Sequence, residues 1–442
     1  MAQTFDLILK NGLVVNHDGE GVRDVGVKGG KIAEIGSLSG ASAGEVIDCA
    51  GLHVLPGVID TQVHFREPGP THKEDLESGG RAAVLGGITA VFEMPNTNPL
   101  TTTPEAIADK LSRAKGRMQC DHAFYVGATH ENARHLPELE MLPGVCGVKI
   151  FMGASTGDLL VPDDDGVREV LRHGRRRVAI HSEDEFMLRE GKALAREGDW
   201  TSHPEVRSVE AAVSSTKRLL RLAYETRRRI HVLHVSTADE IPLLAAAKDI
   251  ATAEATPQHL TLEAPECYER LKGFAQMNPP VRDARHRAGL WHGVGQGVID
   301  VIGSDHAPHS REEKAKPYPA SPSGMPGVQT LLPIMLDHVA EGRLSLMRLI
   351  DLVCHGPNRI FGIAGKGRLA VGYDADFTLV DMKARHTITD EEGASKCGWT
   401  PFAGMTVKGF PKGTIIRGRR VMWEGTITGP ATGAPMRFQE AL

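Results

Sequence analysis

The stretch GVIDTQVHFREPG, residues 57–69, begins with an apolar run and ends in polar residues that can do chemistry. It opens a series of eight apolar runs, which alternate with longer segments of helical period. The other seven are ITAVFEM (88–94), HAFYVGA (122–128), CGVKIFM (146–152), RVAIH (177–181), IHVLHV (230–235), IATAEAT (250–256) and VIDVIGSDH (298–306). Eight β/α units predict a (β/α)8 TIM barrel, with a doubly wound sheet as the alternative.

The segments between the runs include two clear helical candidates. TPEAIADKLSRAKG (103–116) follows a threonine cap, and RSVEAAVSSTKRLLRLAYETRRR (207–229) is amphipathic over several turns. Both chain ends instead read as short strands with glycine turns, and Gly29 and Gly30 allow a tight hairpin. We therefore expect a small composite β-sandwich domain from residues 1–56 and 367–442, beside a barrel over residues 57–366.

Composition and charge favour a globular protein of the cytoplasm. The formal net charge of -5 comes from interspersed charges, so we interpret the short basic runs RHGRRR (172–177) and ETRRRI (225–230) as solvated helix ends and expect no nucleic-acid binding. The N-terminus lacks the pattern of a secretory signal, and no apolar run reaches the roughly 18 residues of a membrane span. The six cysteines form no C-x-x-C pair and are expected to be buried and reduced.

Polar residues stand at the ends of most of the predicted strands. They are His64, Arg66, Asn96, Lys149, His181, His234 and Asp305. In a barrel the carboxyl ends of the strands surround one bowl, so these side chains should face one another. A lone histidine is more often a core or surface residue than a ligand, and the combination is what predicts a site. Strand alternation puts His231 and His234 on opposite faces, so we expect only His234 in the bowl.

Lys149 carries the one charge within GVKIFM. Burial lowers the pKa of an amine, and a neutral amine can react with carbon dioxide to give a carbamate that bridges two divalent metals. The alternative is a structural lysine paired with a carboxylate.

These residues resemble the amidohydrolase superfamily and, within it, the dihydroorotases. The motifs run in family order through nearly the whole chain: DTQVHFREPG, HKEDLESGGRAAVLGGITAVFEMPNTNP, GVKIFMG, AIHSEDE, IHVLHVSTADEI, TPQHLTL, QMNPPVR, GSDHAPH and GYDADFTLVD. The resemblance implies a barrel with a small β domain, and it implies the zinc-dependent, reversible conversion of N-carbamoyl-L-aspartate to L-dihydroorotate in pyrimidine synthesis.

The resemblance also implies roles for individual residues. His64 would bind the more buried of two zinc ions, His181 and His234 the second, and a carboxylated Lys149 would bridge them. Asp305 would hold the first metal and act as acid and base. The residues implied in substrate binding are Arg66, Asn96 and His309 for the substrate carboxylate and Asn278 for another contact, with the backbone of PSGMPG (322–327) close to the ring. A homodimer is expected from the family, and GASTGD (153–158) is a candidate closing loop.

Gln62 departs from the family, whose members usually have histidine at the positions of both 62 and 64. Alternation puts Gln62 and His64 on the same face, but an amide oxygen is a poor zinc ligand compared with imidazole. The first metal should therefore be held weakly or be absent, which leaves one or two zinc ions per chain open. Two other functions also stay open. One is a catalytically silent partner of aspartate transcarbamoylase, and the other is a hydantoinase or allantoinase, whose ring lacks the carboxylate that Arg66 would bind.

Overall fold

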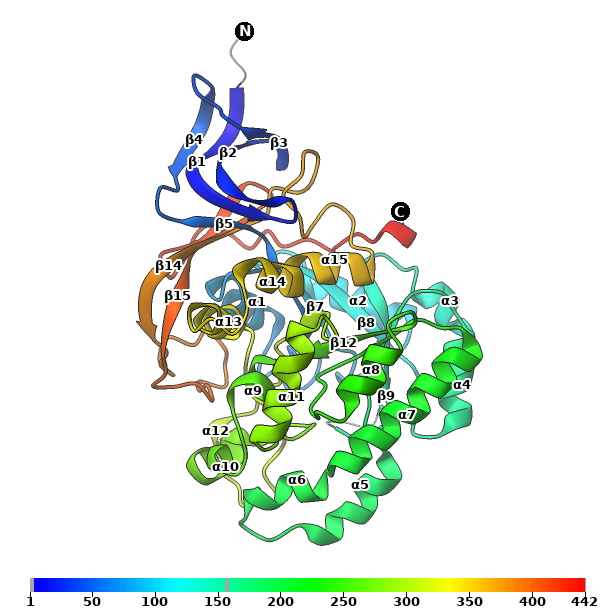
Figure 1. Ribbon diagram of the computed structural model, residues 1–442. Helices are drawn as coiled ribbons and strands as arrows, with labels where there is room; N and C mark the ends of the chain where they lie inside the picture. Colours follow the sequence, from blue (N-terminus) through cyan, green and yellow to red (C-terminus); the bar gives the residue numbers. More distant parts are fainter. Residues whose placement is uncertain (1–3, 156–158, 442) are drawn as a thin grey trace.

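The computed structural model describes residues 4–155 and 159–441 (Figure 1). Eight parallel strands follow one another around a barrel in chain order. They are β6 (Val58–Val63), β7 (Ile88–Glu93), β8 (Asp121–Gly127), β9 (Val145–Phe151), β10 (Val178–His181), β11 (Ile230–Val232), β12 (Ala251–Ala255) and β13 (Val301–Ile302). A bridge between Val63 and His306 brings the two edge strands together. Each of the eight predicted strands is confirmed.

Helices follow the strands and cover the outside of the barrel (Figure 1). In chain order they are α1 (Leu76–Leu85), α2 (Pro104–Ala114), α3 (Leu136–Leu139), α4 (Asp164–Arg172), α7 (Val209–Thr226), α8 (Glu240–Ala246), α11 (Ala284–Gly295) and α13 (Leu331–Ala340). Both helical candidates are confirmed, and the side chains of Thr103 and Ser208 cap α2 and α7. No helix in the described ranges is long and apolar enough to cross a membrane.

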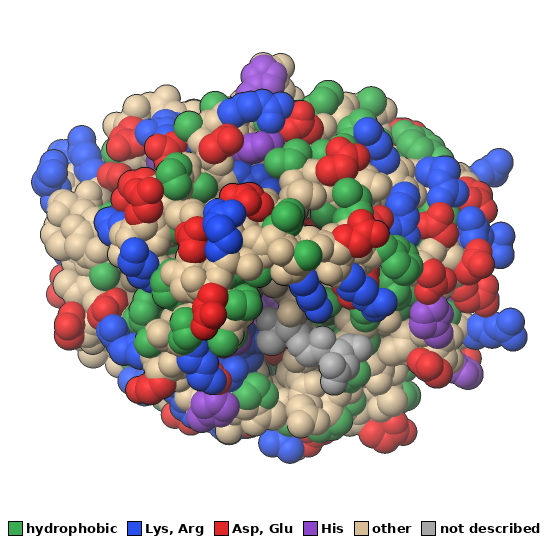
Figure 2. All heavy atoms as spheres, turned by 90° about the horizontal axis from the view of Figure 1, so that it is seen from below, with side chains coloured by type: hydrophobic (Ala, Val, Ile, Leu, Met, Phe, Trp, Pro, Cys, Tyr) green, Lys and Arg blue, Asp and Glu red, His purple; other side chains and the backbone are tan. Residues whose placement is uncertain are grey.

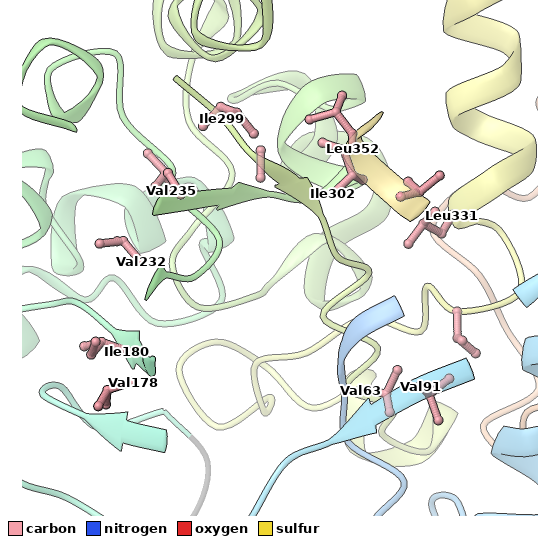
Figure 3. Packing of buried hydrophobic residues seen from close by; sticks show 14 of the residues in the cluster. Val63, Val91, Val178, Ile180, Val232, Val235, Ile299, Ile302, Leu331 and Leu352 are labelled. Atoms are coloured by element: carbon pink, nitrogen blue, oxygen red, sulfur yellow. The ribbon is translucent and has the colours of Figure 1, made fainter. Parts of the chain in front are cut away.

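Strand alternation divides the barrel residues between two environments. In β10, Val178 and Ile180 pack outward into the large cluster between strands and helices (Figure 3), whereas Ala179 belongs to the smaller cluster inside the barrel. Residues 179 and 181 share a face, so the same register that buries Val178 and Ile180 sends His181 to the inside. The core thus sets the direction of the functional side chain.

The two chain ends form one nine-stranded sheet beside the amino end of the barrel. Its strands are β1 (Thr4–Asn16), β2 (Gly19–Lys28), β3 (Lys31–Gly36), β4 (Ser42–Asp48), β5 (His53–Pro56), β14 (Phe377–Thr387), β15 (Thr406–Ile416), β16 (Arg419–Trp423) and β17 (Thr426–Ile427). Strand β5 joins the two ends, because it pairs with both β1 and β14. Gly29 and Gly30 have φ of 58° and 74° and form the expected hairpin turn between β2 and β3.

The prediction of solvated helix ends at the two basic runs is wrong for one arginine in each run. Arg176 and Arg228 are buried, since their guanidinium groups donate to backbone carbonyls: Arg176 to that of Glu140 and Arg228 to that of Arg176. Both lie where the chain enters a barrel strand rather than where a helix meets water. The cysteines are all free and buried, as expected.

Candidate active site

The candidate residues lie at the carboxyl end of the barrel. Several short helices that follow barrel strands gather at this lower end of Figure 1, and Figure 2 shows it as a hollowed surface with mixed charges. These helices are α5 (Glu185–Gly191), α6 (His203–Val206), α9 (Pro257–Thr261), α10 (Glu266–Leu271) and α12 (Arg311–Lys314). Arg66, His234 and Asp305 have φ of 61°, 35° and 45°, a strained left-handed conformation that each adopts just after a strand ends. Such strain is typical of functional sites.

The left-handed residue at 234 corrects the expectation drawn from strand alternation. His231 is buried inside the barrel, with Nδ1 2.8 Å from Thr252 Oγ1 and its ring against Phe361. Strand β11 ends at Val232, and the turn at His234 directs that ring to His181. Both histidines therefore lie inside, His231 deep in the barrel and His234 in the bowl.

His64 and Asp305 form the first pair of candidate ligands. His64 Nε2 lies 3.2 Å from Asp305 Oδ1, and His64 Nδ1 lies 2.9 Å from Asn96 Oδ1. Gln62 Nε2 donates to the same Asp305 oxygen at 3.0 Å. Gln62 therefore faces the bowl, as expected, but it presents a donor rather than a ligand atom.

His181 and His234 form the second pair. His181 Nδ1 lies 3.0 Å from His234 Nε2, and His181 Nε2 lies 2.7 Å from Glu183 Oε2. Glu183 also forms a buried ion pair with Arg207, whose Nη2 donates to Ala154 O at 2.9 Å. After the opposing effect of burial, the charges of Arg207 and His181 hold the pKa of Glu183 well below its usual value. A carboxylate behind an imidazole is a common way to orient a metal ligand.

Lys149 lies within electrostatic range of both pairs. Its side chain is 1% exposed and its Nζ stands 4.4 Å from the centre of the Phe151 ring. Burial lowers the pKa of Lys149 to about 7, against the attraction of Asp305 and Glu254. Burial is also the main cause that lowers the pKa of His181 and His234, and the charge of Lys149 acts in the same direction, whereas Glu183 opposes both at His181. The expected tendency of Lys149 to lose its proton is supported.

The donor set fits a cation such as zinc. Asn96 Oδ1 accepts from His64 Nδ1, so the lone pair on His64 Nε2 faces a carboxylate oxygen, an arrangement that a cation or proton between them would relieve. Glu183 accepts from His181 Nε2 in the same way and leaves the lone pair on Nδ1 facing His234. Within the described residues, Gln62 Oε1 and His234 Nδ1 are buried without hydrogen-bond partners. Imidazole and carboxylate are the ligands that zinc prefers.

Arg66 and His309 lie next to the first pair. Arg66 Nη2 is 3.4 Å from His309 Nε2, and Arg66 Nε donates to Pro308 O at 3.3 Å. Arg66 is 3% exposed, and within residues 4–155 and 159–441 it forms no ion pair with a carboxylate. Burial lowers the pKa of Arg66 to about 10. Asp305 and other carboxylates act on Arg66 from a distance, but a buried guanidinium without a carboxylate in ion-pair contact among the described residues still suits an anionic ligand.

Asn278 and the glycine-rich loop lie on the neighbouring wall. Asn278 Oδ1 is 3.1 Å from His203 Nε2, and Pro279 O is 3.0 Å from His259 Nε2. In the 322–327 segment, Ser323 O lies 2.9 Å from His309 Nε2. The structure thus brings the loop to His309. Of the candidate closing loop 153–158, residues 156–158 lie outside the described residues.

Sequence reasoning missed several supporting residues. Glu183 stands two residues after His181 in HSEDE, which is a weak signal, because residues at that spacing share a strand face. Arg207 and Glu254 had no local signal. Lys73 contacts the other ring nitrogen of His309. Its Nζ lies 3.0 Å from His309 Nδ1 and 3.0 Å from Glu313 Oε1.

An acidic cluster lies away from this site, between the barrel and the terminal sheet. Asp121, Asp374 and Asp376 could hold a metal by their mutual distances. Lys366 Nζ already lies among them, at 2.6, 2.9 and 2.6 Å, and Arg417 also pairs with Asp121. We interpret it as an ion-pair network that joins the two parts of the fold.

The barrel and the polar side chains at the ends of its strands define a hydrolase of the TIM-barrel class. The chain belongs to the amidohydrolase family, whose pattern matches residues 53–421. It is therefore an enzyme that hydrolyses amide-type C–N bonds.

Known proteins are similar to the chain over almost its full length. A dihydroorotase from Methanosarcina acetivorans is 36% identical, covering 96% of this chain and 93% of its own. An allantoinase from Escherichia coli is 35% identical and covers 94% of each chain. The solved L-hydantoinase (dihydropyrimidinase) from Arthrobacter aurescens has a TM-score of 0.93 and 32% identity, covering 98% of this chain and all of its own. The expected family and fold are confirmed.

Proposed function

We propose that the protein is a dihydroorotase, which interconverts N-carbamoyl-L-aspartate and L-dihydroorotate in pyrimidine synthesis. The observation that carries this proposal is the buried guanidinium group of Arg66, which lies beside His309. Arg66 forms no ion pair with a carboxylate in the described part of the chain. Dihydroorotate carries a carboxylate on its ring, and a guanidinium binds a carboxylate through paired charge-assisted hydrogen bonds. The similarity to dihydroorotases at 36% identity supports the same assignment.

The residues of the bowl divide the work between binding and proton transfer. Arg66, His309 and Asn96 bind the substrate carboxylate, and Asn278 contacts the remainder of the substrate. In the hydrolytic direction Asp305 accepts the proton of the attacking water and passes it to the ring nitrogen that leaves. Gln62 Nε2 donates a 3.0 Å hydrogen bond to Asp305 Oδ1 and thereby fixes the orientation of that carboxylate.

A metal would be held by His64, Asp305, His181, His234 and Lys149. Zinc in this place lowers the pKa of a water molecule toward neutrality and polarises the amide carbonyl. We propose that the second pair, with Glu183 behind His181, binds firmly and that the pair His64–Asp305 binds weakly, with a carboxylated Lys149 as the bridge when two ions are present. The Gln62 amide supports this difference, because its NH2 group already satisfies Asp305 Oδ1.

The test is turnover by the purified, zinc-supplemented protein. At mildly acid pH it should form dihydroorotate from carbamoyl aspartate, and Asp305→Ala should abolish the activity while leaving the fold intact by circular dichroism. Absence of turnover in both directions by a folded, zinc-loaded protein would refute the proposal. Tight co-purification with an aspartate transcarbamoylase in that case would favour the silent partner.

A second candidate function is the opening of hydantoin or allantoin rings. The similarity to the allantoinase, at 35% identity, and the TM-score of 0.93 to the L-hydantoinase favour it. Allantoin and 5-substituted hydantoins should therefore be assayed beside dihydroorotate, and a hydantoinase should tolerate Arg66→Ala. The homodimer and the cytoplasmic location stay predictions.

A further inference from the structure

The two basic runs of the sequence meet at the amino end of the barrel, opposite the candidate active site. They precede β10 and β11, and together with α15 (Gly356–Phe361) and the turn Gln439–Ala441 they surround a hollow of about 180 Å3. Four arginines line it: Arg176, Arg177, Arg229 and Arg359. Glu440 is the one acidic residue among the described residues of its wall.

The two inner arginines lack ion-pair partners among the described residues. Arg176 is 3% exposed and stacks on Phe438, with its Cζ 4.4 Å from the ring centre. Its Nη1 donates to the carbonyls of Glu140 and Val145, whereas its Nη2 has no partner among the described residues. Arg177 donates through Nη1 to Ile230 O at 2.8 Å, and its buried Nε is also without a partner there. Neither forms an ion pair in the described ranges.

The two outer arginines stand at the mouth of the hollow. Arg229 is 52% and Arg359 51% exposed at the side chain. Arg229 Nη2 lies 3.5 Å from Glu440 Oε1, and Arg359 Nη1 lies 3.2 Å from Asp351 Oδ1. Glu440 and Asp351 thus offset the two outer arginines, and the charges of Arg176 and Arg177 leave the hollow positive among the described residues.

We propose that this hollow is a binding site for a small phosphate-bearing anion. Four guanidinium groups around one hollow match the oxygens of a phosphate, which accept several charge-assisted hydrogen bonds at once. The half-exposed Arg229 and Arg359 at the mouth leave the hollow accessible from water, and about 180 Å3 is enough for one phosphate group. A free phosphate and a nucleotide phosphate share this chemistry.

The location links the hollow to the strands that carry the candidate metal ligands. Cys146 of its wall lies in β9, and Arg177 and Arg229 immediately precede β10 and β11. The carboxyl ends of these three strands bear or lead to Lys149, His181 and His234. An anion bound here contacts three ligand-bearing strands at once while leaving the active-site bowl free.

Equilibrium dialysis of the purified full-length protein against radiolabelled inorganic phosphate, at constant ionic strength, tests the proposal. The parent should bind about one phosphate per chain, and the double variant Arg229→Gln/Arg359→Gln should bind at least about tenfold more weakly, because one charge-assisted hydrogen bond contributes that much. The matched control is Arg420→Gln, an arginine of the terminal sheet that is 40% exposed and paired with Glu45 at 2.8 Å. It should bind phosphate within about twofold of the parent.

Arg66→Gln separates this hollow from the active site, the other place where a guanidinium could attract phosphate. Under the proposal this variant binds phosphate like the parent. No binding by the parent at millimolar phosphate, or a loss in Arg66→Gln without a loss in the double variant, would overturn it. Competition by a nucleoside monophosphate identifies the source: tighter binding than phosphate indicates a nucleotide site, and equal binding indicates a site for free phosphate.

Discussion

Replacing Glu183 with glutamine should weaken both the fold and the metal site. Glu183 is fully buried and connects the His181 ring, at 2.7 Å, to the Arg207 guanidinium. Glutamine keeps the size of the side chain but removes the charge that both partners require. The change therefore probes the electrostatic role of Glu183 with little change in packing.

We expect two separate effects, one on the free energy of unfolding and one on the affinity for metal. Loss of one member of a buried ion pair costs about 3–5 kcal/mol, and because glutamine retains one carbonyl acceptor for Arg207 we expect about 3 kcal/mol. The His181 ring also loses the acceptor that fixes its metal-binding nitrogen, and changes of this kind lower metal affinity by about 10–100-fold.

Urea unfolding of the metal-free protein measures the first effect, and zinc competition with a chromophoric chelator measures the second. Glu240→Gln is the matched control: Glu240 is also buried, but its oxygens accept from Thr216 and Thr237 and form no ion pair with any residue that the structure describes. It should leave zinc affinity unchanged. A Glu183→Gln protein with zinc affinity within about twofold of the parent would refute the orienting role.

Three further predictions concern the bowl. Gln62→His should raise bound zinc toward two ions per chain, and a parent that already holds two would contradict the weak first position. Arg66→Gln should raise KM for carbamoyl aspartate by about 10–100-fold, the value of a charge-assisted hydrogen bond, and steady-state kinetics with an unchanged KM would argue against carboxylate binding. Burial is the main cause that raises the pKa of Glu254 from 4.5 to about 8. Between these two pH values the folded metal-free protein holds a proton that the unfolded chain has released, so the free energy of unfolding falls as pH rises. Glu254→Gln should flatten that fall, and urea midpoints that stay parallel to those of the parent across this range would contradict the assignment.

The fold could be predicted from the sequence because most barrel strands are short, mainly apolar runs between longer segments of helical period. The largest differences between predicted and observed strand ends are at the two shortest strands, which we predicted to continue to residues 235 and 306. Strand β11 ends at Val232 and β13 at Ile302, since His234 and Asp305 take a left-handed conformation just beyond them. The apolar pattern continues past these points, and backbone geometry rather than hydrophobicity ends the strands.

The supporting residues of the site could be predicted less well than the candidate ligands. A ligand at the end of a strand has a local signal, namely a polar residue that closes an apolar run. Arg207 and Lys73 act across 24 and 236 residues of sequence, on Glu183 and His309, and nothing near them in the chain marks these contacts. The basic runs show the same limit: each looked like a solvated end, and their convergence in one hollow depends on the closed barrel.

Gln62 illustrates why a residue type alone does not determine how many metals the bowl holds. Its amide has a donor end and an acceptor end, and here the NH2 group faces the Asp305 oxygen that also lies 3.2 Å from His64 Nε2. A cation between His64 and Asp305 competes with that hydrogen bond, whereas a histidine at position 62 would offer it a further lone pair. If the Gln62 amide were rotated by about 180°, its Oε1 would face Asp305 Oδ1, and two such oxygens lie close together favourably only when a cation is between them. These contacts support the proposal that glutamine at position 62 weakens the first metal position without removing it, and that the pair His181–His234, with Glu183 hydrogen-bonded to His181, is the firmer of the two.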